Sequence, residues 1–226
     1  MIIEPIERLL RKLGYEFSDI TLAEQALTHR SVSSKNNERL EFLGDAILGF
    51  VIAEELYRRF PDAQEGALSR MRAFLVKGET LAEVARELSL GDHLTLGSGE
   101  LKSGGFRRDS ILACGLEAMI GAVYLDGGEP ACRKLLLHLF QARLDDASPD
   151  KVEKDPKTRL QELLQGQGSP LPEYHLINVE GEHHAQKFYV ECHIETLKTP
   201  SKGMGNSRRK AEQKAARDAL ARLAAK

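Results

Sequence analysis

Three acidic residues within residues 36–45 have a spacing that suits the binding of a divalent metal ion. Glu38, Glu41 and Asp45 stand at i, i+3 and i+7, so on an α-helix they fall on one side while aliphatic residues fall on the other. Residues 46–53 carry no charge, and we therefore expect Glu41 and Asp45 to be partly buried. Buried carboxylates this close repel one another unless a cation or shared protons compensate. A hard divalent ion would do so; the alternative is an amphipathic helix whose acids face water.

Residues 111–125 form a second predicted helix, in which Glu117 is the one charged residue. Core helices rarely carry such a residue without a partner. Glu117 could lie at a partly exposed edge or pair with Arg107 or Arg108. Alternatively, it faces the acids of the first helix and completes a carboxylate cage for Mg²⁺. Such a cage suits phosphodiester hydrolysis, because a bound metal lowers the pKa of a water molecule and neutralises charge developing on the phosphate.

These acids depend on helices for their positions, and up to about residue 144 nearly every segment has a helical pattern. Glycine-containing turn signals, such as those at residues 91–92, 104–105 and 127–128, separate the segments. We therefore predict an all-α domain over residues 1–146. Its predicted helices cover residues 5–13, 21–28, 37–59, 65–76, 77–88, 110–125 and 130–144.

The pattern changes beyond residues 147–155, which are polar, lack apolar periodicity and lie in a stretch with two prolines, as in a linker. The pattern of residues 156–226 predicts a small α+β domain. The predicted fold class is therefore multidomain, with an all-α domain followed by an α+β domain. A third strand is expected around residues 195–200. The other predicted elements are helices over residues 158–165 and 207–225 and strands over residues 173–180 and 187–194.

The charge is divided unevenly between the two parts. Residues 1–150 hold 18 Lys and Arg against 24 Asp and Glu, whereas residues 151–226 hold 14 against 10. An acidic part joined to a basic part indicates chemistry in the first and contact with a polyanion in the second.

The cysteines and the apolar segments indicate in which compartment of the cell the protein lies. Cys114, Cys132 and Cys192 have neither CxxC nor zinc-type spacing, and reduced thiols are expected. The N-terminus lacks a signal-peptide pattern, and the longest apolar run is judged too short for a bilayer and contains Glu117. We expect a cytoplasmic protein without a membrane partner.

The basic segment over residues 203–217 has the character of a phosphate-binding site. Gly203 and Gly205 permit close approach of a backbone, Ser207 can cap a helix, and the helix N-terminus favours anionic oxygens. Cations at a helix start are disfavoured by the helix dipole, which indicates an external anion, although a solvated basic face is the ordinary alternative. The four cations are Arg208, Arg209, Lys210 and Lys214.

The chain resembles the bacterial ribonuclease III family along essentially its whole length. NNERLEFLGD at residues 36–45 matches the hallmark motif of that family, and residues 203–217 resemble the last loop and helix of double-stranded-RNA-binding domains. LTHRS at residues 27–31, EGALSRMRA at residues 65–73 and GELKSGGFRR at residues 99–108 match as well. The resemblance implies an all-α endonuclease domain that works as a homodimer, followed by an α-β-β-β-α RNA-binding domain.

The resemblance also implies an activity and its site. The activity is cleavage of double-stranded RNA to 5′-phosphate ends in ribosomal and messenger RNA processing, with Mg²⁺, or Mn²⁺ as a substitute, and no organic cofactor. The RNA-binding domain is expected to read duplex shape and 2′-hydroxyls. By position, the metal ligands and catalytic acids are Glu41, Asp45 and Glu117, with Glu38 and Glu65 as supporting acids; the RNA contacts are Gln161, Glu162, His184, Arg208, Arg209, Lys210 and Lys214.

One position departs from the family, because Cys114 stands where an Asp ligand is expected, three residues before Glu117. A thiol is soft and largely protonated near neutral pH, which makes it a poor ligand for Mg²⁺. This substitution leaves open a catalytically weakened or inactive double-stranded-RNA-binding protein. A helical metallophosphohydrolase acting on small nucleotides is a second alternative, which the basic C-terminal part disfavours.

Overall fold

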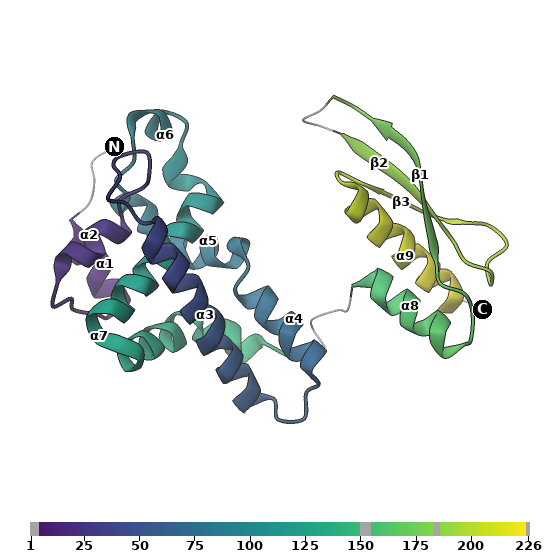
Figure 1. Ribbon diagram of the computed structural model, residues 1–226, viewed down its shortest axis with the longest axis horizontal. Coiled ribbons are helices and arrows are strands. Elements are labelled where there is room, and N and C mark those ends of the chain that lie inside the picture. Colours follow the sequence, from purple (N-terminus) through teal and green to yellow (C-terminus); the bar gives the residue numbers. More distant parts are fainter. Residues whose placement is uncertain (1–4, 150–154, 183–185, 225–226) are drawn as a thin grey trace. The chain divides into compact units, whose positions relative to one another are not determined.

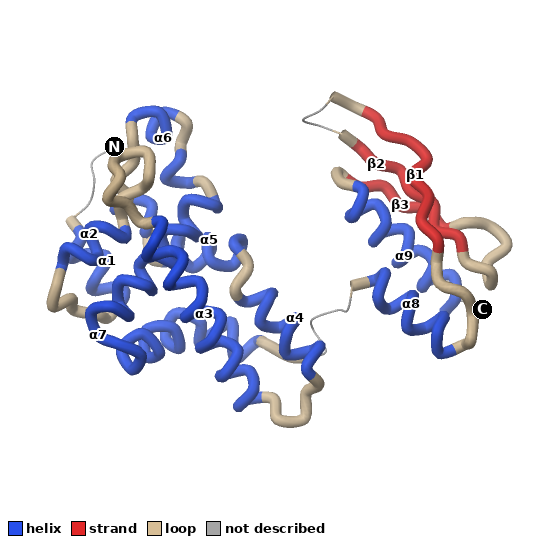
Figure 2. Tube along the Cα trace, in the orientation of Figure 1, coloured by secondary structure: helices blue, strands red, loops and turns tan. Residues whose placement is uncertain are grey.

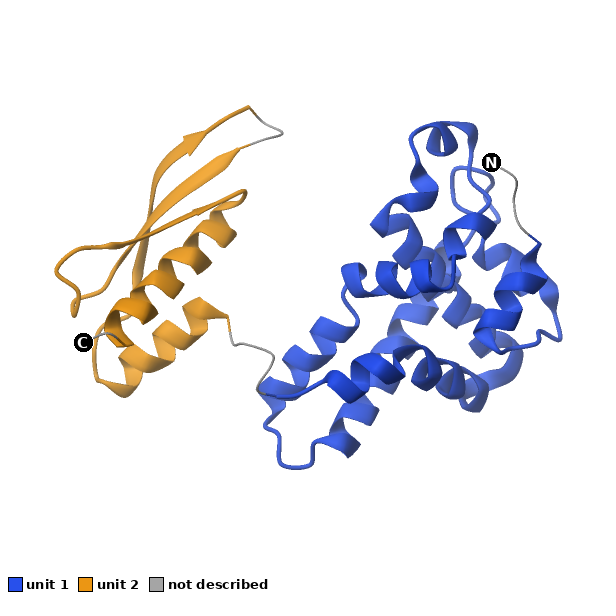
Figure 3. Ribbon diagram, turned by 180° about the vertical axis from the view of Figure 1, so that it is seen from behind, with its two compact units in different colours: residues 1–152 blue, residues 153–226 orange. Residues whose placement is uncertain are grey.

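The computed structural model describes residues 5–149, 155–182 and 186–224 (Figure 1). The chain divides into two compact units, residues 1–152 and 153–226 (Figure 3). The described part of the first unit is helical, and the strands lie in the second unit (Figure 2). The predicted fold class, all-α followed by α+β, is confirmed.

The first unit is built on two long helices, α3 (Glu38–Arg59) and α7 (Asp109–Asp146), that pack against each other at glycines. A Cβ atom on Gly44 of α3 would lie 1.7 Å from the Glu117 carbonyl oxygen, and one on Gly121 of α7 would lie 2.3 Å from the Leu40 carbonyl oxygen. Any larger residue would force the backbones apart. The glycines therefore hold the carboxylate-bearing turns of α3 and α7 against one another.

Apolar side chains of both helices form the core of this unit. Leu48 and Ile52 of α3 and Leu116 and Ile120 of α7 are fully buried, and each contributes roughly 1.5–3 kcal/mol of transfer free energy. The remaining described elements surround this pair: α1 (Ile6–Leu13), α2 (Ile20–Ala26), α4 (Glu65–Leu75), α5 (Gly78–Glu87), a 3₁₀ turn (Leu90–His93), α6 (Ser98–Lys102) and a second 3₁₀ turn (Gly105–Arg107).

Helix α7 joins the two helices that the sequence predicts over residues 110–125 and 130–144. The expected turn at residues 127–128 is a kink within one element, where Gly128 has φ 72° and ψ −172° and Pro130 follows. That φ is readily adopted by glycine and costly for other residues. The non-helical Gly128 therefore separates two helical segments, as the sequence predicts, and the second segment continues to Asp146.

The judgement that no apolar run is long enough for a bilayer is wrong for α7. By length and composition this helix could cross a membrane. However, 61% of its apolar stretch is buried inside the unit, as in the core helix of a soluble protein. The apolar character of α7 is therefore explained by the helices that pack around it.

In the second unit, two helices cover one face of a three-stranded antiparallel sheet of order β1-β2-β3 (Figure 1). Val190 and Cys192 of the middle strand pack with Leu160, Leu164 and Ala215 of the helices. The elements are α8 (Pro156–Gly166), β1 (Glu173–Glu180), β2 (Lys187–His193), β3 (Ser201–Gly205) and α9 (Arg208–Ala224).

The third strand was predicted at the wrong place, and the role of two glycines changes with it. Residues 195–200 form the loop that ends in Pro200, whereas β3 pairs residues 201–205 with β2. A Cβ atom on Gly203 would lie 2.1 Å from the Ala211 carbonyl oxygen, and Gly205 has a similar restriction. These glycines thus admit α9 onto the sheet, and their part in a phosphate-binding site stays a prediction.

Candidate metal centre and nucleic-acid interface

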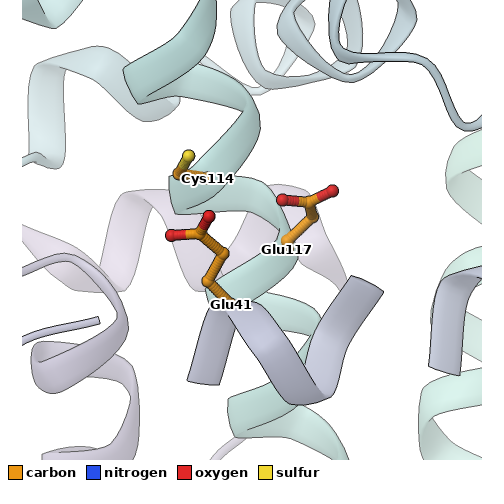
Figure 4. A group of neighbouring side chains, drawn as sticks. All are labelled: Glu41, Cys114 and Glu117. Atoms are coloured by element: carbon orange, nitrogen blue, oxygen red, sulfur yellow. The ribbon is translucent and has the colours of Figure 1, made fainter. Parts of the chain in front are cut away.

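Glu41 of α3 lies beside Cys114 and Glu117 of α7 (Figure 4). One ligand atom from each of the three side chains lies within 4.8 Å of the other two, and all three side chains are half-buried. Within the described ranges this is the one such group of His, Cys, Asp or Glu residues. It lines a cavity of about 580 Å³, which Asp45 also lines. The structure thus brings together four of the predicted metal-site residues.

The prediction that both Glu41 and Asp45 are partly buried is wrong for Asp45. Asp45 is exposed, whereas Glu41 is half-buried. No described element of this chain covers that side of α3, on which Phe42 is 79% exposed. Burial of a helix face depends on what packs against it, and the uncharged run after Asp45 did not reveal this. Asp45 still acts on the site through its charge.

Burial and neighbouring carboxylates shift the ionisation of Glu117. Desolvation is the larger cause and the charges of Asp45 and Glu41 the smaller, and together they raise the pKa of Glu117 to about 7. Neither arginine considered as a partner neutralises it. Arg108 pairs with Glu100 at 3.0 Å, and the Arg107 guanidinium lies over the ring of its neighbour Phe106. This acidic site is therefore one that a cation would stabilise.

The protein without metal is expected to lose stability as the pH rises from about 5 to about 7. Glu117 ionises near 4.5 ordinarily and near 7 in the folded state, so between these values the folded state binds more protons than the unfolded state. The free energy of unfolding then falls with rising pH, by about 1–2 kcal/mol once partial exposure is allowed for. Urea unfolding in EDTA at both pH values measures it, and Glu117→Gln should reduce the fall. An equal fall in both proteins would contradict the assignment.

The Cys114 thiol lacks the charged oxygen of a hard metal ligand. Burial, foremost, then a hydrogen bond to Glu41 and the charges of Glu41 and Glu117 raise the pKa of its thiol to about 12. Two carboxylates at this spacing suit a divalent ion, but a soft thiol in the third place does not suit Mg²⁺. The donor set therefore fits a divalent metal in number and spacing, and departs from Mg²⁺ in chemistry.

Two basic side chains on the cavity wall were not assigned a role from the sequence. Arg30 pairs with Glu38 at 3.5 Å, and Arg108 pairs with Glu100; all four line the cavity. Their segments match family motifs, which was the available signal. Glu38 is thus at the site but already paired, and the arginines place positive charge on the cavity wall beside the acids.

The Glu65 side chain does not lie with the other predicted acids in the cavity of this chain. It begins α4, where its carboxylate accepts a hydrogen bond from the Ser69 hydroxyl at 2.6 Å. It is absent from the described lining of the cavity. The described residues that share the cavity come from α3, α6 and α7 and from the loops near them, and α4 contributes none.

The predicted basic residues lie on the first two turns of α9 and are exposed. The Ser207 hydroxyl accepts a hydrogen bond from the Lys210 amide at 3.3 Å, as expected of a helix cap. Arg208 pairs with Glu212 at 2.9 Å. Within residues 155–182 and 186–224, no ion pair engages the other three predicted cations, Arg209, Lys210 and Lys214.

The other predicted RNA contacts are only partly described. Gln161 and Glu162 are exposed on α8, where both side chains are accessible to a ligand. His184 lies outside the described residues. The predicted RNA contacts that the structure describes therefore lie on α8 and α9.

Comparisons with known proteins cover both units. A model of the "Ribonuclease-III-like" family matches residues 19–144, and one of the "Double-stranded RNA binding motif" matches residues 156–223. Ribonuclease 3 of Vibrio atlanticus is 59% identical over 219 residues, 97% of each chain. Ribonuclease 3 of a Marinomonas species is 60% identical over 217 residues, 96% of each chain.

Solved structures agree for the first unit. The nuclease domain of ribonuclease III from Campylobacter jejuni superposes with a TM-score of 0.61 at 42% identity, covering 64% of this chain and 99% of that one. A second structure of that domain, which concerns flexibility in the region involved in dimer formation, gives 0.60 at 44% identity, covering 61% and 97%. With sequence relatives that match along nearly the whole length, the chain belongs to the ribonuclease III family.

Proposed function

We propose that this ribonuclease III family member cleaves double-stranded RNA with the help of a divalent metal ion held by Glu41, Glu117 and position 114. The observation that carries the proposal is the juxtaposition of these side chains across α3 and α7 in one cavity. The second unit, which matches the double-stranded RNA binding motif, supplies affinity for the substrate.

The residues of the site divide the chemical work. A bound divalent ion supplies Lewis-acid chemistry, activating water and offsetting charge on the phosphate. Glu41 and Glu117 would hold the ion from two helices whose separation is fixed by their glycine contact. Asp45 is exposed at the cavity, where it can orient water, and Arg30 and Arg108 can draw the RNA backbone toward it.

We further propose that the protein works as a homodimer. Large apolar side chains are exposed on α3 and α4, including Phe42 at 79%, Phe50 at 58%, Tyr57 at 72% and Phe74 at 54%. Exposed apolar side chains gathered on packed helices indicate a protein interface. The related C. jejuni nuclease domain has a region involved in dimer formation, which supports a homodimer here. Ribosomal and messenger RNA precursors in the cytoplasm are the proposed substrates, on the family resemblance.

Cleavage of a long perfect RNA duplex tests the proposed function. We expect fragments with 5′-phosphate ends in the presence of Mn²⁺, fewer in Mg²⁺ and none in EDTA. A single-stranded RNA of the same sequence should remain intact. Binding of the duplex without cleavage in either metal would instead support the inactive RNA-binding alternative.

Lys210→Ala combined with Lys214→Ala is expected to weaken duplex binding and reduce its salt dependence. Both side chains are exposed on α9, and removing one cation that binds a phosphate lowers the slope of log affinity against log salt by roughly one unit. Binding titrations at several salt concentrations measure the slope. Lys198→Ala, which removes an exposed cation from the loop before β3, is the control and should leave the slope unchanged. An unchanged slope in the double variant would contradict a phosphate-binding role for α9.

A further inference from the structure

Cys114 differs from the two other cysteines in its surroundings. Cys132 and Cys192 are fully buried in the two cores, where they act as small apolar residues. Cys114 is half-buried and lines the cavity, with its sulfur within 4.8 Å of carboxylate oxygens of Glu41 and Glu117. The thiol is therefore placed among the groups that would hold a metal.

The combination of one sulfur and two oxygens favours some divalent ions over others. Mg²⁺ prefers oxygen ligands and near-ideal octahedral geometry. Zn²⁺ and Co²⁺ accept thiolate together with carboxylate, and Zn²⁺ sites with three protein ligands keep a fourth position for water or substrate. The cavity of about 580 Å³ beside the three side chains leaves room for such a position.

We propose that the site formed by Glu41, Cys114 and Glu117 binds Zn²⁺ through the Cys114 sulfur in preference to Mg²⁺. Binding forms a metal–sulfur bond, breaks the S–H bond and releases one proton to solvent. The proposal rests on the proposed placement of the metal in this cavity. It implies that Zn²⁺ competes with the ion that supports RNA cleavage.

Cobalt provides a spectroscopic test, because a thiolate bound to Co²⁺ gives a sulfur-to-metal charge-transfer band that carboxylates do not give. The full chain, stripped of metal with EDTA and dialysed, is titrated with Co²⁺, and Zn²⁺ is then added. We expect the band to form and to be removed by Zn²⁺ but not by an equal concentration of Mg²⁺. Cys192→Ala should keep the band, whereas Cys114→Ser should lose it and bind Co²⁺ at least about tenfold more weakly.

Failure of the Zn²⁺ proposal can be distinguished from failure of the proposed function. Co²⁺ binding without a charge-transfer band, measured by calorimetry, would overturn the thiolate ligand. Duplex cleavage in Mn²⁺ would remain unaffected by that result. A band that persists in Cys114→Ser would also overturn the proposal, because another thiol would then hold the ion.

A second measurement needs no variant. Cys114 is the one cysteine that is not buried, so iodoacetamide should alkylate it first in the folded protein. Zn²⁺ should slow this alkylation at least about tenfold, while Mg²⁺ leaves it unchanged, as followed by mass spectrometry of the peptide that contains Cys114. Equal alkylation rates with and without Zn²⁺ would overturn the proposal even if Cys114→Ser failed to fold.

Discussion

Cys114→Asp is expected to raise the rate of duplex RNA cleavage at limiting Mg²⁺ by about tenfold or more. The change replaces a protonated thiol with a hard oxygen beside Glu41 and Glu117, and positions 114 and 117 share one face of α7. The gain should shrink in Mn²⁺, which binds protein sites more tightly than Mg²⁺. Initial rates on one duplex substrate across a Mg²⁺ titration measure the effect.

A variant with an amide at position 114 distinguishes an effect of charge on the cleavage rate from an effect of side-chain packing. Cys114→Asn should give no gain, because it matches Asp in size but not in charge. If Cys114 were only a small apolar residue, the Asp variant would unfold at a lower temperature and cleave no faster. Equal rates for the original and Asp proteins at limiting Mg²⁺ would mean that position 114 does not ligate the metal.

Glu117→Gln is expected to reduce cleavage by at least about a hundredfold while leaving affinity for duplex RNA nearly unchanged. The amide keeps the shape of the side chain but removes the charge opposite Glu41, whereas we propose that RNA affinity resides mainly in the second unit, which matches the double-stranded RNA binding motif. Single-turnover cleavage and binding measured in EDTA give the two quantities separately.

Glu87→Gln is the matched control, because Glu87 pairs with Arg143 and is absent from the cavity lining. It should retain cleavage. A collapse of RNA affinity in Glu117→Gln would instead show that the carboxylate supports the fold, and the assignment of Glu117 to the metal would fall.

Much of the fold follows from sequence periodicity, since helices such as α3 and strands such as β2 begin and end within one or two residues of their predicted bounds. The misplaced third strand has a physical cause. Gly203 and Gly205 are poor strand formers by composition, and their fit beneath α9 becomes visible only when strand and helix are packed. Local pattern cannot reveal a requirement that a distant element imposes.

The grouping of Glu41 with Glu117 was predictable from the sequence, and the surroundings of this group were less so. Spacing on one helix and an isolated charge on another were sufficient to pair Glu41 with Glu117. The exposure of Asp45 and the ion pairs of Arg30 and Arg108 depend on loops and on uncovered surface. These features require the tertiary arrangement, because neither periodicity nor charge pattern encodes them.

The contact at Gly44 and Gly121 leaves the metal centre no means of adjusting by moving its helices. The backbones of α3 and α7 already touch at these glycines, which carry a hydrogen atom where other residues carry a Cβ atom. A cysteine sulfur is one bond closer to its own backbone than an aspartate oxygen would be, and α7 cannot advance to make up the difference. The longer bond of a metal to sulfur, about 2.3 Å for Zn–S against about 2.0–2.2 Å for Zn–O, offsets only part of this shortfall. In a frame this rigid, exchanging one side chain changes which ion fits.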